Sequence, residues 1–271
     1  MTTYNGRKYA PKITKSEAAD IVSATGWLAN SPTRFRNELL SRVRVVHFPK
    51  DATIYRIDDE PLGIYGLVEG QLRIELDVFE IGEQVAFIAQ SGFWVGVSSA
   101  IYSRKRSVTL SCASPSTLLF LPTVEFEHLA IDADNMRQFA KLAIENNDMI
   151  RSVARDLMNS DIRARIASRL VAICGGGAIR MGHRSMPIEI TQADLAMVCN
   201  ISRKTANQGL AQLEKMGVLS RAYRKLFVTD IEALHRIASG NFARVSARQR
   251  ISAPASPSVA SSIGVSIASA L

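Results

Sequence analysis

The stretch that decides the fold is residues 191–228, TQADLAMVCNISRKTANQGLAQLEKMGVLSRAYRKLFV. It opens with Thr191, a good helix N-cap, and Asp194 three positions later can reach back to it in a capping-box arrangement. Apolar residues over the next five positions give a short helix with one apolar face. A turn follows at Cys199-Asn200-Ile201, where asparagine tolerates a left-handed backbone, and Ser202 caps a second helix. The stretch therefore predicts a helix-turn-helix.

The second helix has two faces with different chemistry. Its expected inward face consists of small and apolar side chains, Thr205, Ala206, Leu210 and Leu213. Its outward N-terminal face carries side chains that can reach base edges and phosphates in a major groove, Arg203, Lys204, Asn207 and Gln208. After Gly217, two strand-like segments flank the basic tip Arg221-Ala222-Tyr223-Arg224-Lys225, which is typical of a wing. An ordinary helical hairpin with solvated charges is the alternative, but the order of caps, turn, helix and wing favours a winged helix-turn-helix.

Charge and composition point to an anionic partner. The chain has 271 residues, 47% of them hydrophobic, which suffices for one large or two modest domains with real cores. Its net charge is +8 and its isoelectric point is about 9.6. The basic excess lies between Asp161 and Arg250, in the segment that holds the helix-turn-helix, as attraction to DNA phosphates requires.

Cysteine usage and hydropathy predict a cytoplasmic protein without a membrane partner. The three cysteines, Cys112, Cys174 and Cys199, are odd in number and widely spaced, so no disulfide framework or zinc site follows. The N-terminus lacks the apolar core of a secretory signal. No apolar run approaches the length of a membrane span.

The remaining pattern divides the chain into five parts. Short segments rich in Val, Ile, Thr and aromatic residues run from Val43 to Leu121, and several such strands favour an antiparallel barrel, sandwich or roll. We expect a polar leader, a helical lead-in with the β-rich domain, a long helix, a winged helix domain and a disordered, Ser/Ala/Pro-rich tail with a basic start, over residues 1–20, 21–121, 122–160, 161–240 and 241–271. Within the fourth part we expect a strand pair near Ala178–Met181 and Pro187–Ile190, and a last helix capped by Thr229.

The long helix carries an apolar seam with alternating steps of three and four residues, the a/d spacing of a coiled coil. Its members are Met136, Phe139, Ala143, Asn146, Ile150, Val153 and Leu157. A long helix packed on its own β-domain gives the same spacing, and both arrangements can hold. We expect a homodimer through this seam, with Asn146 setting the register.

Several motifs resemble the Crp/Fnr family of bacterial transcription regulators over roughly residues 25–238. They are FPKDATIYR, IYGLVEGQLRI, SGFWVG, RSVTLSCA, DIRARIASRL and the helix-turn-helix block. The resemblance implies an α+β fold with an N-terminal antiparallel β-roll of the cyclic-nucleotide-binding type, a long dimerisation helix and a C-terminal winged helix-turn-helix. It also implies a homodimer on palindromic double-stranded DNA near promoters, where RNA polymerase is a further partner.

The resemblance assigns roles to the basic residues by position. Arg203, Lys204 and Gln208 occupy the three places that usually contact bases, with Lys204 replacing the usual Glu and Gln208 a usual Arg. The preferred half-site should therefore differ from the common one of the family. Phosphate contacts fall to the two caps and the wing, Thr191, Ser202, Arg221, Arg224 and Lys225.

The phosphate cassette of cyclic-nucleotide binders in this family is half kept. Gly96 and Arg106-Ser107 are present, but Val97 stands where a Glu would bond the ribose hydroxyl. An unpaired buried hydroxyl costs roughly 1–3 kcal/mol. On the long helix, where hydroxyl residues often meet the base, an ungapped alignment places Ile150 and Arg151, with Ser152 adjacent. We expect cyclic AMP binding in the usual mode to be lost. The alternative is an effector-gated regulator that binds a cyclic nucleotide or another small anion at Arg106 and Ser107. A third possibility is that residues 104–106 form a plain basic loop.

Other sensors and functions lack the residues they need. An iron–sulfur sensor needs several N-terminal cysteines, but none precedes Cys112, and nothing beside Cys112 or Cys174 indicates a lowered thiol pKa. A haem ligand would be an isolated histidine, His47 or His128. A metalloenzyme on the roll needs converging histidines, and His47 alone lies there. A scaffold or regulatory subunit leaves the basic winged helix unexplained. We therefore expect a regulator with no metal, cofactor or catalytic activity. A regulator whose DNA binding requires no small ligand is an alternative within this class.

Overall fold

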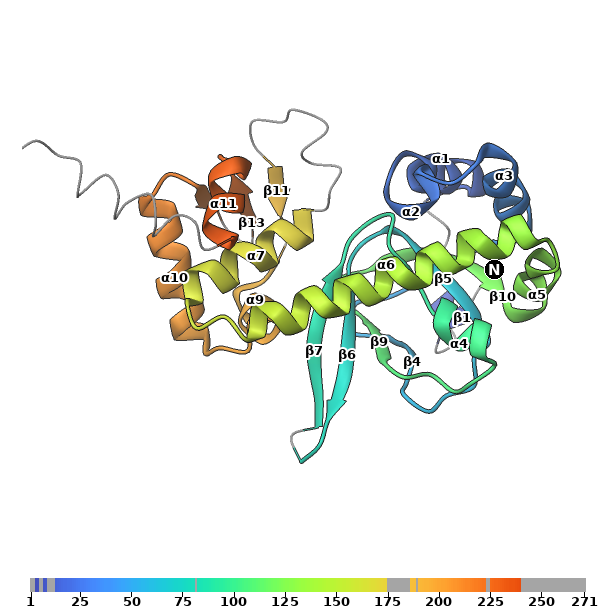
Figure 1. Ribbon diagram of the computed structural model, residues 1–271, viewed down its shortest axis with the longest axis horizontal. Coiled ribbons are helices and arrows are strands. Elements are labelled where there is room, and N and C mark those ends of the chain that lie inside the picture. Colours follow the sequence, from blue (N-terminus) through green and yellow to red (C-terminus); the bar gives the residue numbers. More distant parts are fainter. Residues whose placement is uncertain are drawn as a thin grey trace, which may run out of the picture.

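The computed structural model describes residues 3–4, 7–8, 13–80, 82–174, 186–188, 190–222 and 225–239 of the chain. The long helix α6 (Ala133–Leu157) runs along a β-rich body and leads at its C-terminal end to a smaller, mostly helical body (Figure 1). This arrangement confirms the α+β class and the order of roll, long helix and winged helix.

Three helices precede the roll, after a short pair of strands. They are α1 (Lys15–Ala24), α2 (Gly26–Ala29) and α3 (Thr33–Arg42), and the strands are β1 (Thr3–Tyr4) and β2 (Arg7–Lys8). The expectation of a polar leader through residue 20 is wrong, because α1 already begins at Lys15. The Thr14 Oγ1 accepts from the Glu17 N–H at 3.2 Å, and the Glu17 carboxylate accepts from the Thr14 N–H at 2.8 Å. This reciprocal capping starts the helix early.

The roll consists of two four-stranded antiparallel sheets that enclose one apolar core. Their strand orders are β3-β10-β5-β8 and β4-β9-β6-β7. The strands are β3 (Arg44–Phe48), β4 (Thr53–Tyr55), β5 (Gly63–Glu69), β6 (Leu72–Val78), β7 (Gly82–Ala89), β8 (Trp94–Val95), β9 (Thr109–Cys112) and β10 (Ser116–Pro122). Leu67 and Leu118 from the first sheet and Leu72 and Leu110 from the second are all fully buried in the shared core. A short helix, α4 (Val97–Tyr102), connects the sheets between β8 and β9.

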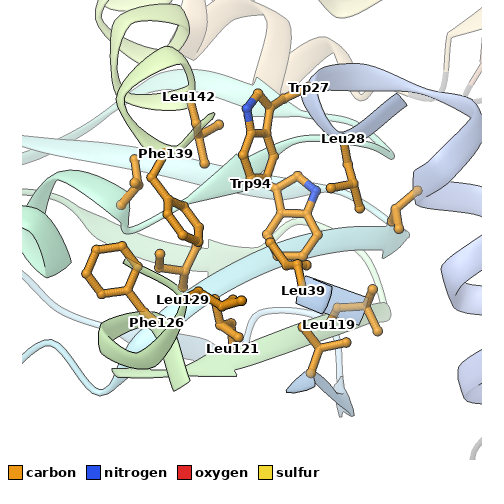
Figure 2. Packing of buried hydrophobic residues seen from close by; sticks show 14 of the residues in the cluster. Trp27, Leu28, Leu39, Trp94, Leu119, Leu121, Phe126, Leu129, Phe139 and Leu142 are labelled. Carbon is orange, nitrogen blue, oxygen red and sulfur yellow. The ribbon is translucent and has the colours of Figure 1, made fainter. Parts of the chain in front are cut away.

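An aromatic cluster fixes α6 on the roll and on the helices that precede it. Figure 2 shows Phe139 and Leu142 of α6 in this cluster together with Trp27 and Phe126. The Phe139 ring lies 4.8 Å from the ring of Phe126, which belongs to α5 (Thr123–Ala130), 5.2 Å from that of Phe35 and 6.0 Å from that of Trp27. The Trp27 Nε1 donates to the Gln138 carbonyl at 3.1 Å. One face of α6 is therefore buried within its own subunit.

The C-terminal body is a winged helix with one apolar core. Its helices are α7 (Ile162–Cys174), α9 (Gln192–Val198), α10 (Arg203–Lys215) and α11 (Ile231–Ala238). Its antiparallel sheet has the order β11-β13-β12, from β11 (Met186–Ile188), β13 (Lys225–Val228) and β12 (Leu219–Ala222).

One expectation for the C-terminal part of the chain is wrong, one strand is shifted, and two further expectations lie outside the described residues. Asp230, not Thr229, caps α11: its carboxylate accepts from the Ala233 N–H at 2.8 Å, while the Thr229 hydroxyl donates to the Gly217 carbonyl. The expected strand near Ala178–Met181 and the tail over 241–271 lie outside the described residues. The expected strand at Pro187–Ile190 corresponds to β11, which begins and ends earlier.

Candidate nucleic-acid interface and roll cavity

Local capping and one close helix contact position the recognition helix α10. The Ser202 Oγ accepts from the Thr205 N–H at 3.1 Å, as the sequence predicts for a cap. Ala206, Leu210 and Leu213 are fully buried. At Gly209 a Cβ would lie 2.3 Å from the Ile166 Cδ1, so glycine allows α10 to approach α7 closely. The inward face of α10 is thus locked against the winged-helix core.

The opposite face at the start of α10 presents basic and amide side chains to solvent. Arg203, Lys204 and Gln208 are exposed, and Asn207 beside them is half-buried with its Oδ1 lacking a hydrogen-bond partner. Neither cation forms an ion pair within the described part of the chain. A helix of this kind can enter a major groove with its N-terminal residues toward the base edges. The four residues predicted from sequence therefore share one surface.

The wing places its basic residues differently from the expectation. The Arg221 Nε donates to the Glu214 Oε2 at 2.7 Å, and the Arg221 N–H donates to the Glu214 Oε1 at 3.1 Å. These hydrogen bonds hold the pKa of Glu214 below its usual range. Arg221 therefore fastens the wing to α10 instead of pointing freely toward phosphate, because Glu214 near the C-terminal end of α10 lies within hydrogen-bond distance. Lys225 is exposed at the start of β13, and Arg224 lies outside the described residues.

The cap of α9 engages its own helix. The Thr191 Oγ1 accepts from the Asp194 N–H at 3.0 Å and donates to the Asp194 Oδ2 at 2.7 Å. The Asp194 carboxylate thus reaches the hydroxyl of the cap, and not its backbone N–H as in a full capping box. Thr191 itself remains exposed at the helix N-terminus, where phosphate contacts are common.

Sequence reasoning missed the arginines that tie the winged helix to α6. Arg165 of α7 donates to the Asn159 carbonyl at 2.6 Å and to the Cys199 carbonyl at 3.2 Å, joining the α6–α7 connection to the turn of the helix-turn-helix. Arg169 is 1% exposed and donates to the Val153 carbonyl at 3.0 Å. Burial lowers the pKa of Arg169. The contacts with Cys199 and Val153 join residues 34 and 16 positions apart, so no local pattern signals them.

A cavity of about 490 Å³ opens between the roll, α4 and α6. Gly96, Arg106 and Ser107 line it, as the cassette predicts, together with Arg104 and mostly apolar side chains. Ser152 does not line it: its hydroxyl donates to the Met149 carbonyl within α6 at 2.7 Å, and Met149 and Ile150 face the cavity instead. The expectation for Ser152 is therefore wrong, because the helix turns that residue away.

Within this cavity wall, Arg106 is already bound by the protein. It is 3% exposed, and it donates to the Gly63 carbonyl at 2.5 Å and the Gly96 carbonyl at 3.2 Å. Its guanidinium lies 4.3 Å from the centre of the Tyr55 ring, a cation–π distance. Gly96 has a φ of 98°, and a Cβ there would lie 2.6 Å from the Arg106 Nη1. Val97 is fully buried in the core that contains the aromatic cluster, not in the cavity.

The predicted dimer seam on α6 largely faces its own subunit. Phe139 is fully buried, the Asn146 Nδ2 donates to the Trp94 carbonyl at 3.0 Å, and Val153 is 5% exposed. The seam prediction is wrong at Phe139 and Val153, since heptad spacing identifies a stripe but not the surface that covers it. Met136, Ala143 and Ile150 are half-buried, and Leu157 is 40% exposed.

A second stripe with the same spacing lies one residue further along α6, and most of it is exposed. We call it the outer stripe; it consists of Arg137, Ala140, Ile144, Asn147, Arg151, Ala154 and Met158. Ile144 is 58% exposed and Met158 is 86% exposed. The outer stripe is apolar at Ile144 and Met158, while Arg137 and Arg151 pair with Asp134 and Asp148 of the same helix. Ile144 and Asn147 also line the cavity.

Thiol and metal chemistry find little support in the geometry. Burial raises the pKa of Cys112 to about 11 and that of Cys199 to about 12. No group of three or more His, Cys, Asp or Glu in the described ranges could hold a metal ion. Among the helices described, none has the length and apolar character needed to cross a membrane.

Comparisons with known proteins match both bodies. Residues 45–132 match the family model of the cyclic nucleotide-binding domain, and residues 164–237 match that of the Crp-like helix-turn-helix domain. The chain is 22% identical over 215 residues to a CRP-like cAMP-activated global transcriptional regulator of Mycobacterium tuberculosis, covering 73% of this chain and 89% of that protein. It is 21% identical over 190 residues to the transcriptional regulator LdrP of Thermus thermophilus, covering 70% and 94%.

Solved structures share the fold. FixK2 from Bradyrhizobium japonicum superimposes with a TM-score of 0.63 at 18% identity, covering 72% of this chain and 96% of that one. The matched domains, their order along the chain and the related regulators together show that this chain belongs to the Crp/Fnr family of transcription regulators.

Proposed function

We propose that this chain is a homodimeric, sequence-specific DNA-binding regulator that acts on an inverted-repeat promoter site and is not gated by cyclic AMP in the usual mode. The observation that carries the proposal is the exposed start of α10, where Arg203 and Lys204 lie beside Gln208 without ion-pair partners among the described residues. Arginine forks onto guanine O6 and N7, and glutamine pairs with adenine. A regulatory role is therefore the function that this surface supports best.

Selection of bound sequences from a random duplex pool tests this function directly. We expect an inverted repeat to be recovered both with and without cyclic AMP. Recovery only in the presence of cyclic AMP would contradict the proposal that the nucleotide does not gate DNA binding. The absence of any enriched sequence would contradict sequence-specific DNA binding. Lys204 and Gln208 replace residues that are usual in the family, so the recovered half-site should differ from the common one.

The outer stripe of α6 supports the homodimer. Apolar residues exposed along a long helix at heptad spacing favour helix–helix association, and Asn147 would be the polar residue that sets the register. The Ile144→Asp variant should be monomeric in light scattering, while Ile131→Asp should remain dimeric. Ile131 is a matched control, because it is 83% exposed but precedes α6. A dimeric Ile144→Asp protein would contradict this interface.

Two features of the cavity support the loss of cyclic AMP binding. Val97 can neither accept the ribose hydrogen bond nor face the cavity, since it is buried in the core. The Arg106 guanidinium is committed to two carbonyls, so phosphate would have to compete with them. Titration calorimetry should give no measurable heat with cyclic AMP. Binding at micromolar concentrations would contradict this proposal.

A small anion in the same cavity is the second candidate. Its lining contains Arg104 and Arg106, and none of the lining residues is acidic. The phosphate ion is a suitable probe, and Arg104→Gln, at an exposed position, should weaken its binding without unfolding the roll. Equal binding by the variant and the wild type would place the anion elsewhere.

A further inference from the structure

The winged helix contacts the roll through α9. This helix packs against β7 of the roll on one side and against α10 on the other. Ile88 of β7 is 1% exposed and belongs to the same apolar cluster as Leu195 of α9, and Val85 packs against that cluster. The core of the winged helix is thus partly completed by side chains of the roll. Apolar contacts of this kind hold two bodies together but do not by themselves fix their rotation, since the hydrophobic effect is non-directional.

One directed contact crosses the same boundary. The Arg73 Nε of β6 donates to the Asp194 Oδ1 of α9 at 3.0 Å. The Arg73 and Asp194 side chains are 17% and 6% exposed, so water screens the pair little. Within the described residues it is the one ion pair that joins the roll to the winged helix.

Arg73 is oriented from the side of the roll before it meets Asp194. Its Nη1 donates to the Asp51 Oδ1 at 3.1 Å and to the Cys112 carbonyl at 3.4 Å. On the other side, the Asp194 Oδ2 accepts from the Thr191 hydroxyl at 2.7 Å, at the start of α9. The chain of contacts therefore runs from the roll, through Arg73, to the first turn of the helix-turn-helix.

We propose that Arg73 is a positioning residue for DNA binding, which fixes the rotation of the winged helix relative to α6 by holding Asp194. The winged helix is also attached to α6 through α7, where Arg165 holds the α6–α7 connection and Arg169 donates to the Val153 carbonyl. Polar contacts at α7 alone leave the body free to rotate about that helix, whereas a directed contact at α9 defines its orientation. Two recognition helices of a dimer must lie about 34 Å apart to read successive turns of the major groove. Loss of the Arg73–Asp194 pair would let the distance between the two recognition helices vary.

This inference rests on the proposed homodimer at an inverted repeat, and it predicts that affinity depends on the spacing between the two half-sites. The test compares the wild type with Arg73→Gln and with the control Arg44→Gln, since Arg44 is an exposed arginine of the roll that lies away from α9. Fluorescence anisotropy measures the affinity of each protein for the selected inverted repeat, for repeats with altered half-site spacing and for a single half-site. Thermal melts establish that each variant is folded.

The wild type and Arg44→Gln should prefer one half-site spacing. Arg73→Gln should lose about tenfold in affinity at that spacing, bind the other spacings with little discrimination and bind the single half-site as the wild type does. Asp194→Asn should behave like Arg73→Gln, because both remove the same ion pair. Asp51→Asn retains the pair and should have a smaller effect.

Three results would overturn the inference. Equal affinity and equal spacing preference in Arg73→Gln would show that the ion pair positions nothing. Tighter binding by Arg73→Gln would mean that the pair holds the winged helix away from DNA. An equal loss at the single half-site would indicate a damaged winged helix. Failure of the wild type to bind any inverted repeat is a separate outcome, because it refutes the proposed function before any variant is measured.

Discussion

Replacing Phe139 by alanine decides which face of α6 is covered by its own subunit. The Phe139 side chain is fully buried and contacts three aromatic rings at centroid distances of 4.8, 5.2 and 6.0 Å. Truncation of a buried Phe costs about 3–5 kcal/mol, and each aromatic pair contributes roughly 0.5–1.5 kcal/mol beyond area burial. With three such pairs, we expect the upper half of that range, about 4–5 kcal/mol.

The assay is thermal unfolding of the full chain at two protein concentrations. For a domain of this size, 1 kcal/mol lowers the melting temperature by roughly 2–4 °C, so the Phe139→Ala roll should melt about 10 °C lower. Phe79→Ala is the matched control, because Phe79 is 88% exposed, and it should melt as the wild type does. The loss should be the same at both concentrations, since Phe139 packs within one subunit.

Two results would refute this reasoning. A loss below about 1 kcal/mol would mean that the aromatic cluster is not packed as described. A variant that becomes monomeric while its roll keeps its melting temperature would place Phe139 in the dimer interface, as the heptad spacing alone predicts.

The remaining predictions concern the DNA-binding body. Arg203→Ala should lose about 1–3 kcal/mol of discrimination at one base pair of the half-site, measured by competition with single-base variants, and a uniform loss across all sequences would contradict base reading. The hydrogen bond from Arg221 lowers the pKa of Glu214, so this contact stabilises the wing above the ordinary carboxylate pKa of 4.5, and the stabilisation is lost as the pH falls through the lower folded value. NMR titration should show a lower Glu214 pKa in the wild type than in Arg221→Ala, and equal values would argue against the contact. Burial raises the pKa of Cys199 to about 12, so its thiol should react with a disulfide reagent at pH 8 much more slowly than an unfolded control, and equal rates would contradict its burial.

The sequence by itself determined the elements whose signals are local. Thr191 and Ser202 cap their helices as predicted, because a cap requires a side-chain oxygen three residues from the N–H it accepts. For the caps, the interacting residues lie close together in the chain, so the pattern contains the contact. The roll was predicted from the composition of several short strand segments and from the family resemblance, although its strand pairs join distant residues such as Leu67 and Leu118.

Only the tertiary structure decided which surfaces those elements cover. Heptad spacing identified a stripe on α6, but Phe139 of that stripe is buried against the helices that precede the roll. The stripe that is exposed lies one residue further along the helix. Arg106 and Arg221 are recognisable as basic residues, yet their partners lie 43 and 7 positions away. Arg73 and Asp194 are 121 positions apart. A charge in a sequence does not specify its partner, because long-range pairs form only when packing brings their elements together.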